Sequence, residues 1–264
     1  MVEIRQAPLK VLVVDDSAFN RKSIGEILSA SPEVQVVGKA ADGEEALRLA
    51  GSLRPDVITL DLEMPRMDGF TFLRILMSKM PTPVIVVSSY SQKENVFKAL
   101  ELGAHAFVAK PDRYVDSELS SIKSELVSKV LLARSLRRTV LSARPRFESI
   151  SGVHNLERAQ PQPLSVLEPP RTVVAVASST GGPTALMEIF GRLPKGIPTA
   201  VLIAQHMPDK FTRTFAERLD KRSAFRVSEA QDMDEVGSST AFVCPGRKCM
   251  FDDTPPSGSL RVRV

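Results

Sequence analysis

The sequence predicts an α/β protein built from two units, an N-terminal (βα)5 unit and a second parallel α/β unit of the doubly wound, Rossmann-like class. In both regions, short apolar and β-branched runs alternate with amphipathic helical patterns, which is typical of parallel sheets covered by helices. A polar, proline-rich stretch separates the two regions. The length of 264 residues suits two domains of ordinary size, each large enough to bury its own core.

The first unit is expected over residues 9–130 as a five-fold repeat of strand and helix. Its strands are the apolar runs, in order 11–14, 34–37, 57–60, 83–87 and 106–109. After each strand, apolar side chains recur at helical spacing, in order over 19–28, 46–50, 72–76, 96–100 and 122–130. The pair Asp42-Gly43 supplies the expected start of the second helix.

The periodicity fails after the first unit, and residues 131–170 are expected to form a basic, proline-rich linker. Between Lys123 and Arg158, eight Lys or Arg residues stand against three Glu, a net charge of +5 in a chain whose total is +4. Because the rest of the chain then carries −1, we expect a solvated connector and no nucleic-acid partner.

The second unit is expected over residues 171–264. Its strands are predicted over 173–177, 199–204 and 241–244, with helices over 185–190 and 211–219 and a hairpin at 260–264.

The composition, 43% hydrophobic and 25% charged residues, is typical of a soluble globular protein. No apolar run approaches the ~20 residues of a membrane span, and the N-terminus lacks a secretory pattern, so we expect no direct membrane insertion. The two cysteines, Cys244 and Cys249, have no second pair or nearby histidine for a zinc site. A reducing, cytoplasmic setting is therefore expected.

Charged and hydroxyl residues stand where the strands of the first unit end. Asp15 and Asp16 follow the first strand and Asp61 the third, while Ser88 and Lys110 end the fourth and fifth. The carboxyl ends of parallel strands meet at the edge where ligands bind in open α/β sheets. Three carboxylates there would repel one another unless a hard cation such as Mg²⁺ neutralised them. A carboxylate can also accept a phosphoryl group.

This arrangement closely resembles the response-regulator receiver domain. The residues that carry the resemblance are Asp15-Asp16, Asp61 before Leu62-Glu63-Met64-Pro65, Asp68-Gly69 and Lys110-Pro111. The resemblance implies phosphorylation of Asp61 and a Mg²⁺ cofactor held by Asp15, Asp16, Asp61 and the Glu63 carbonyl. It further implies that Ser88, Phe107 and Lys110 form the phosphoryl switch, with Phe107 turning inward. A cis Lys110–Pro111 bond is also implied.

A hydroxyl residue ends the first strand of the second unit. Ser179 is followed by Thr180 and then Gly181-Gly182, where glycines let the backbone approach a carbonyl and leave N–H groups free for an oxyanion hole. His206 ends the next strand, in position to act as a general base. A plain tight turn, a phosphate cradle and a structural histidine are the alternative interpretations of these residues.

Taken with the receiver-like unit, the chain is similar to the chemotaxis-type protein-glutamate methylesterase family. The carrying segments are Ser179–Pro183, Ala204–Pro208, Phe211–Arg213, Phe215–Leu219 and Pro245-Gly246. The resemblance implies a serine hydrolase, with Ser179 as nucleophile and His206 as base, that needs no cofactor for the esterase step. Its substrates would be γ-glutamyl methyl esters of methyl-accepting chemoreceptors, with deamidation of glutamines as a further activity. Its phosphodonor would be a chemotaxis-type histidine kinase, and the unphosphorylated receiver would block the Ser179–His206 edge.

Three departures from the family pattern stand out. Ala177-Ser178 precedes the nucleophile where Gly-Ala is usual, and Cys249-Met250 stands where the family has His-Met. The Gly-Met-Gly-x-Asp-Gly segment that supplies the third triad member is not found in the sequence. We therefore expect the second unit to be incomplete at its C-terminus, with an open sheet edge and slower hydrolysis.

Two other functions compete with a phosphorylation-gated hydrolase. One is a non-enzymatic receiver with a vestigial effector that binds partners or drains phosphate from a kinase. The other is a DNA-binding regulator that uses the basic connector. The second is disfavoured because no helix-turn-helix pattern follows the first unit.

Overall fold

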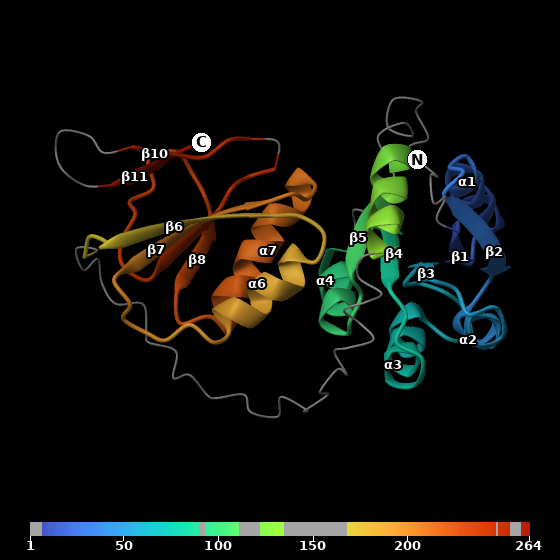
Figure 1. Ribbon diagram of the computed structural model, residues 1–264. Coiled ribbons are helices and arrows are strands. Elements are labelled where there is room, and N and C mark those ends of the chain that lie inside the picture. Colours follow the sequence, from blue (N-terminus) through green and yellow to red (C-terminus); the bar gives the residue numbers. More distant parts are fainter. Residues whose placement is uncertain (1–6, 90–92, 111–121, 135–167, 247, 254–259) are drawn as a thin grey trace, which may run out of the picture. The chain divides into compact units, whose positions relative to one another are not determined.

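The computed structural model describes residues 7–89, 93–110, 122–134, 168–246, 248–253 and 260–264. The chain divides into two compact units, Met1–Pro145 and Arg146–Val264. Figure 1 shows the elements of both. Within these described ranges, no helix is both long and apolar enough to cross a membrane.

The first unit is built on a parallel sheet of five strands in the order β2-β1-β3-β4-β5. The strands are β1 (Leu9–Val14), β2 (Val34–Ala40), β3 (Val57–Leu60), β4 (Val84–Ser89) and β5 (Ala106–Lys110). This is the expected five-strand arrangement. The order reverses beside β1, so the carboxyl ends of β1 and β3 flank the point where a doubly wound sheet binds ligands.

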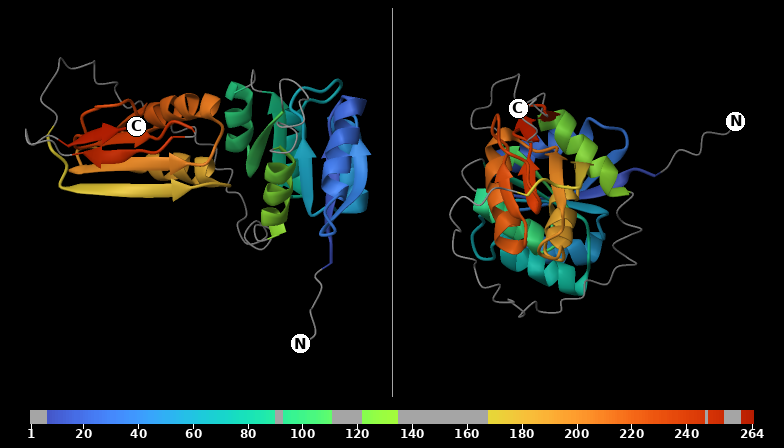
Figure 2. Two further views of the ribbon diagram at one scale, coloured as in Figure 1. Left: turned by 90° about the horizontal axis from the view of Figure 1, so that it is seen from above. Right: turned by 90° about the vertical axis from the view of Figure 1, so that its left-hand side faces the viewer.

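Helices flank this sheet (Figure 2). They are α1 (Ala18–Ser29), α2 (Gly43–Leu53), α3 (Gly69–Lys79), α4 (Lys93–Glu101) and a helix over 122–134. Ser17, Asp42 and Asp68 each accept a hydrogen bond from the backbone N–H three residues on, so each caps the helix that follows it. Asp42 thus begins the second helix as the sequence indicates.

The face covered by α1 and the 122–134 helix holds one continuous apolar core. Ile24 and Leu28 of α1 pack with Leu126 and Val130 against alternate valines of the sheet. Leu131 and Ala133 belong to the same core, so the helix continues through residue 134 into the segment expected to be linker. The Lys110–Pro111 bond, expected to be cis, and residues 135–167 of the connector lie outside the described residues.

The second unit has a parallel sheet in the order β6-β7-β9-β8 and an antiparallel pair, β10 with β11. Its strands are β6 (Thr172–Ser178), β7 (Thr199–Gln205), β8 (Arg226–Glu229), β9 (Thr240–Val243), β10 (Phe251–Asp253) and β11 (Arg261–Arg263). The hairpin was predicted over 260–264; the structure has one strand there, β11, and its partner β10 lies earlier in the sequence. Strand β8 was not predicted, because Val227 is its sole apolar residue and gives no periodic signal.

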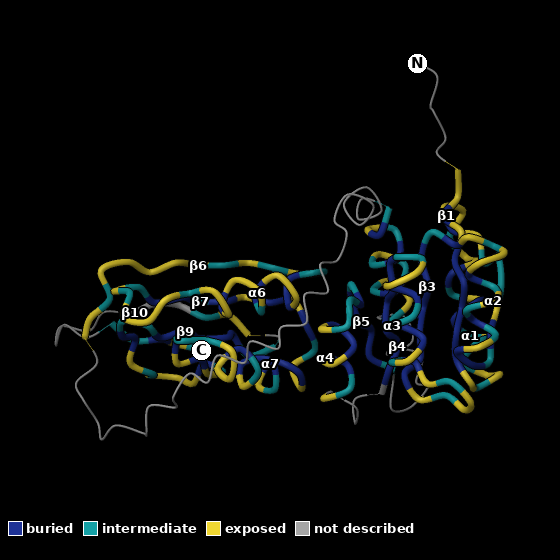
Figure 3. The backbone as a smooth tube through the Cα atoms, turned by 90° about the horizontal axis from the view of Figure 1, so that it is seen from below, coloured by how far each residue is buried: buried dark blue, intermediate teal, exposed yellow. Residues whose placement is uncertain are grey.

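The helices α6 (Gly182–Phe190) and α7 (Asp209–Arg222) pack against each other. Right-handed crossovers from β6 to β7 and from β7 to β8 put both helices on one face of the sheet. On the sheet, the antiparallel β10–β11 pair forms a second apolar cluster, in which Val262 of β11 packs with Ala200 of β7 and Phe242 of β9. Figure 3 shows the contrast between the buried β9 and the more exposed β6.

Strand β6 lies at the edge of this sheet, and Val173 and Val174 are each 41% exposed. Within the described residues, β6 pairs with β7 on one side and nothing pairs on the other. Its continuous apolar composition is typical of a strand buried on both faces, so its exposure is a consequence of its place in the sheet rather than of its residues.

Candidate functional sites

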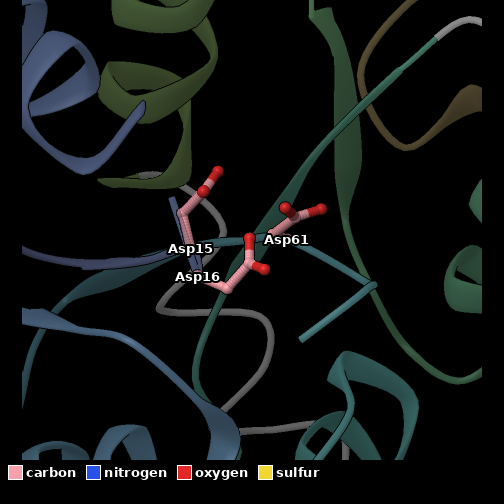
Figure 4. Close-up of side chains that lie close together, drawn as sticks. All are labelled: Asp15, Asp16 and Asp61. Atoms are coloured by element: carbon pink, nitrogen blue, oxygen red, sulfur yellow. The ribbon is translucent and has the colours of Figure 1, made fainter. Parts of the chain in front are cut away.

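The acidic residues predicted to meet in the first unit do meet. One carboxylate oxygen each from Asp15, Asp16 and Asp61 lies within 4.8 Å of the others. Asp15 and Asp16 follow β1 and Asp61 follows β3, two neighbouring strands of the sheet, and Figure 4 shows the three side chains gathered at this edge.

Asp15 is fixed by the chain that follows it. Its side chain is fully buried, and its Oδ1 accepts hydrogen bonds from the Ser17 N–H at 2.9 Å and the Asn20 Nδ2 at 3.3 Å. Arg21 donates to the carbonyl oxygens of Asp15 and Asp16 at 2.7 and 2.8 Å. The start of α1 therefore sets the position of both acids.

Lys110, at the end of β5, reaches across to the same acids. Its Nζ lies 2.6 Å from Asp61 Oδ2 and 2.8 Å from Asp15 Oδ2. Burial, the largest influence, lowers the pKa of Lys110, but its attraction to Asp61 and Asp15 together outweighs burial and raises that pKa. For Asp61, burial is again the largest influence, and because the group is an acid, burial raises its pKa. The charge of Lys110 opposes this rise but does not cancel it.

These residues fit a divalent cation. Three carboxylates and one ammonium leave two negative charges at the site. Asp15 Oδ2 is buried and accepts no hydrogen bond of good geometry, although it contacts the Lys110 ammonium. An exposed Asp16 keeps the cluster open to solvent, and Mg²⁺ prefers a few carboxylates with several waters. The Glu63 side chain is exposed, and a Mg²⁺ contact from its carbonyl stays a prediction.

The other residues named for the switch are buried beside this edge. Ser88 is the second-last residue of β4, which pairs with β5, and Phe107 lies within β5. Lys129 donates to the Phe107 carbonyl at 2.6 Å, and its Nζ lies 5.4 Å from the centre of the Phe107 ring. The Phe107 ring is therefore already inside in this structure. Its movement on phosphorylation stays a prediction.

In the second unit, the structure brings Ser179 and His206 together. Ser179 Oγ lies 3.3 Å from His206 Nδ1, and both side chains are exposed to solvent. β6 and β7 pair in register from Thr172 with Thr199 to Ser178 with Gln205, so the two residues that follow these strands come side by side. The His206 N–H also donates to the Ser178 carbonyl at 2.8 Å. The expected proximity of Ser179 and His206 is confirmed.

Comparisons with known proteins match both units. The response regulator receiver domain matches residues 11–117, and CheB methylesterase matches residues 174–262. Two relatives are named protein-glutamate methylesterase/protein-glutamine glutaminase. One, from Geobacter sulfurreducens, is 45% identical over 97% of this chain and 72% of its own length. The other, from Anaeromyxobacter dehalogenans, is 49% identical over 99% of this chain and 70% of its own length.

The chain belongs to the protein-glutamate methylesterase family. A crystal structure of the response regulator domain of Thermotoga maritima CheB is also similar, with 41% identity and a TM-score of 0.45. It covers 48% of this chain and 97% of that one.

In this methylesterase-family chain, Gln205 has a structural role that the sequence patterns did not assign, although the residue lies within the Ala204–Pro208 segment. Gln205, at the end of β7, is 7% exposed, and its Nε2 donates to the Ser179 carbonyl at 2.9 Å and to the His206 carbonyl at 3.1 Å. Its Oε1 accepts a hydrogen bond from Ser178 Oγ at 2.6 Å. One amide therefore ties together the backbone of the nucleophile and base candidates. A buried glutamine at a strand end, next to His206, was the available signal.

Ser178, the other serine near the candidate nucleophile, is engaged elsewhere. Its hydroxyl donates to Gln205 rather than facing His206. The hydrogen-bonded Ser178 and Gln205 side chains also explain why residue 182 is glycine. A Cβ at this position would lie 2.8 Å from Ser178 Cβ and would collide with Gln205 Oε1. The methylesterase unit therefore requires glycine at this position.

The turn after Ser179 presents backbone donors. Gly181 caps α6 with φ of 78°, a left-handed conformation, and a Cβ there would meet nothing within 4 Å. The Gly182 N–H is engaged by the Ser179 carbonyl at 2.9 Å. The N–H groups of Thr180 and Gly181 donate to no acceptor among the described residues. They are therefore stronger candidates for an oxyanion hole than the N–H of Gly182. The start of α6 adds a positive helix end beside them.

Among the described residues, the His206 ring has one hydrogen-bonding partner, Ser179. None of the carboxylates that the structure describes in the methylesterase unit hydrogen-bonds the ring in the way a triad acid does. Cys249, at the position where the sequence pattern expects histidine, is exposed.

Proposed function

We propose that this chain is a protein-glutamate methylesterase that removes methyl esters from glutamate side chains of chemoreceptors and deamidates glutamines. The observation that carries the proposal is the 3.3 Å approach of Ser179 Oγ to His206 Nδ1 at the carboxyl edge of a parallel sheet. It falls within the region that matches CheB methylesterase, and the relatives named for both activities share nearly half of the residues.

Ser179 would attack the ester carbonyl while His206 takes the hydroxyl proton. The N–H groups of Thr180 and Gly181 would hold the oxyanion that forms, aided by the helix end behind them. His206 would then return the proton to methanol as it leaves. Water, activated by His206, would release the glutamate from Ser179. The open space above Gly181 gives the substrate carbonyl room to approach.

Methanol release from methylated receptor membranes tests this proposal. Ser179→Ala should abolish release, because the nucleophilic oxygen is lost. Ser228→Ala is the matched control: it removes an exposed serine hydroxyl on β8 of the same unit, away from the end of β6, and should leave the rate unchanged. Release from Ser179→Ala at the wild-type rate would exclude Ser179 as the nucleophile. If wild type and the Ser228→Ala control also released no methanol, the non-enzymatic receiver function would be favoured.

The first unit would regulate the second through phosphorylation of Asp61. The phosphodonor would be a chemotaxis-type histidine kinase. Mg²⁺, when bound, would offset the carboxylate charge and that of the incoming phosphoryl group, with Asp15, Asp16 and Asp61 as its protein ligands. Lys110 would pair with the new negative charge, and Ser88 would hydrogen-bond a phosphoryl oxygen. The support is the cluster itself, in which Lys110 already contacts Asp61 and Asp15.

Labelling with a small phosphodonor tests the regulatory part separately. Strand β3 offers a matched pair, because Asp56 precedes it and Asp61 follows it, at opposite edges of the sheet. Asp61→Asn should abolish the acid-labile label, and Asp56→Asn should keep it. Equal labelling of wild type and Asp61→Asn would contradict the assignment.

A further inference from the structure

We propose that Cys244 and Cys249 form a redox-sensitive dithiol next to the Ser179–His206 edge, in which a low-molecular-weight disulfide oxidises the pair to an intramolecular disulfide. Both cysteines are free of disulfide bonds, Cys244 buried and Cys249 exposed. The inference is independent of the esterase reaction.

The backbone between the two cysteines turns back on itself. The Lys248 N–H donates to the Pro245 carbonyl at 3.2 Å, so these two residues, which lie between Cys244 and Cys249, approach each other in a turn. Cys244 Sγ points into this turn and lies 3.4 Å from the Lys248 carbonyl oxygen, which belongs to the peptide unit leading into Cys249. Standard bond lengths then place the Cα of Cys249 within about 6 Å of Cys244 Sγ. The Cα of Cys244 lies about 3 Å from its own Sγ, so the two Cα atoms lie within about 9 Å of each other. A disulfide requires them roughly 4.4–6.8 Å apart, so the bond forms when the segment between the cysteines brings the two Cα atoms into this range.

The two thiols have different roles because their surroundings differ. Cys249 is open to solvent, whereas Cys244 is 7% exposed and its S–H faces the carbonyls of Pro245 and Lys248. Burial, and then the nearby Cys249, raise the pKa of Cys244, which keeps it as the protonated thiol. Cys249 therefore meets an external oxidant first, and Cys244 completes the bond.

The chemistry balances with a disulfide RSSR as oxidant. The Cys249 thiolate attacks one sulfur of RSSR, forming Cys249–S–SR, and RS⁻ leaves and takes up the proton that Cys249 lost. Cys244 then gives up its proton and attacks the Cys249 sulfur. The Cys244–Cys249 bond forms, and the second RS⁻ leaves as RSH. Two protein thiols are oxidised and one RSSR is reduced to two RSH.

The turn is built into the carboxyl edge that carries His206. The Cys244 N–H donates to the Ile203 carbonyl at 2.8 Å, so β9 continues beside the end of β7. A Cβ on Gly246 would lie 2.6 Å from the Asp209 backbone nitrogen, which shows how closely the turn packs on the first residue of α7. Asp209 is three residues after His206. We therefore expect a change in the shape of the turn to shift the start of α7 and, through it, His206.

The test treats the whole chain with oxidised glutathione and a small amount of reduced glutathione, blocks remaining thiols by alkylation, and weighs the peptide that holds both cysteines. Wild type should lose two hydrogen atoms and carry no adduct. Because two thiols joined by a short segment see each other at mM or higher concentration, about 0.1 mM reduced glutathione should leave less than roughly a tenth as mixed disulfide. Wild type that ends as a Cys249–glutathione adduct, as a Cys249-linked dimer, or with both thiols alkylated would overturn the proposal.

Two variants assign the roles. Cys244→Ser should stop at the Cys249–glutathione adduct, and Cys249→Ser should react at least about tenfold more slowly, because its remaining thiol is buried. Equal rates for the two variants would overturn the order of reaction, and the wild-type mass decides the bond itself even if a variant folds poorly. The imidazole NMR signal of His206 should shift on oxidation of wild type and stay in place in Cys249→Ser. An unmoved signal in oxidised wild type would overturn the coupling to the Ser179–His206 edge.

Discussion

Replacing Gln205 with methionine should loosen the Ser179–His206 pair more than any change to a single hydrogen bond. Methionine has a similar length and no amide, so all three Gln205 hydrogen bonds, to Ser178, Ser179 and His206, would be lost. Each is worth about 1 kcal/mol in net stability, which gives a loss of about 3 kcal/mol in the unfolding free energy of the second unit. For a unit of this size, that corresponds to a fall in melting temperature of roughly 10–20 °C.

Thermal unfolding followed by two signals provides the measurement. The protein has two tyrosines, Tyr90 and Tyr114, and no tryptophan, so tyrosine fluorescence reports on the first unit alone. Circular dichroism reports on both units. In Gln205→Met, the tyrosine transition should stay in place while the second part of the dichroism transition moves to lower temperature.

A matched variant sets the scale for Gln205→Met. Ser178→Ala removes one of the three bonds and should cost about 1 kcal/mol. Reaction of Ser179 with a fluorophosphonate probe should slow by up to about a hundredfold in Gln205→Met, because a misplacement of about 1 Å can cost that much. If Gln205→Met were no less stable than Ser178→Ala and reacted with the probe at the wild-type rate, Gln205 would have no organising role.

Three further predictions concern other parts of the chain. Lys110→Met should lower the melting temperature of the first unit in EDTA, and Mg²⁺ should raise it by more than in wild type, since the acids then lack their ammonium partner; an equal Mg²⁺ effect would argue against this balance of charge. The Glu45 N–H, and then Arg66, lower the pKa of Asp42, so its carboxylate stabilises the fold above an unfolded pKa of about 4, and this stability is lost as pH falls through the lower folded pKa. Asp42→Asn should thus melt below wild type at neutral pH and converge with it in acid, as tyrosine fluorescence would show; a constant difference at all pH values would refute the argument. Gly182→Ala should reduce fluorophosphonate labelling more than Gly181→Ala: alanine at 181 is strained by its φ of 78° but meets no neighbour within 4 Å, whereas at 182 a Cβ meets the Ser178 side chain at 2.8 Å; the reverse ranking would contradict the dominance of this collision.

The sequence alone determined where the chemistry gathers. Apolar runs predict most strands, and residues at their carboxyl ends must share one edge of a parallel sheet, so the sequence alone groups Asp15, Asp61 and Lys110. The same reasoning placed Ser179 beside His206, because β6 and β7 are consecutive strands that pair in parallel.

Tertiary structure decided what periodicity does not encode. Strand β8 forms although it has one apolar residue, and β6 is exposed although it has many. Both results depend on which neighbours a strand has in the sheet, and composition alone does not give those neighbours. Gln205 organises the site through hydrogen bonds to Ser178 and Ser179, 27 and 26 positions away, and to its chain neighbour His206, a geometry that residue types alone leave open. The burial of Asp15 beside an exposed Asp16 follows from how α1 packs on β1. Local pattern selects the elements and the edge, whereas the partners of each polar side chain are set by packing between segments distant in sequence.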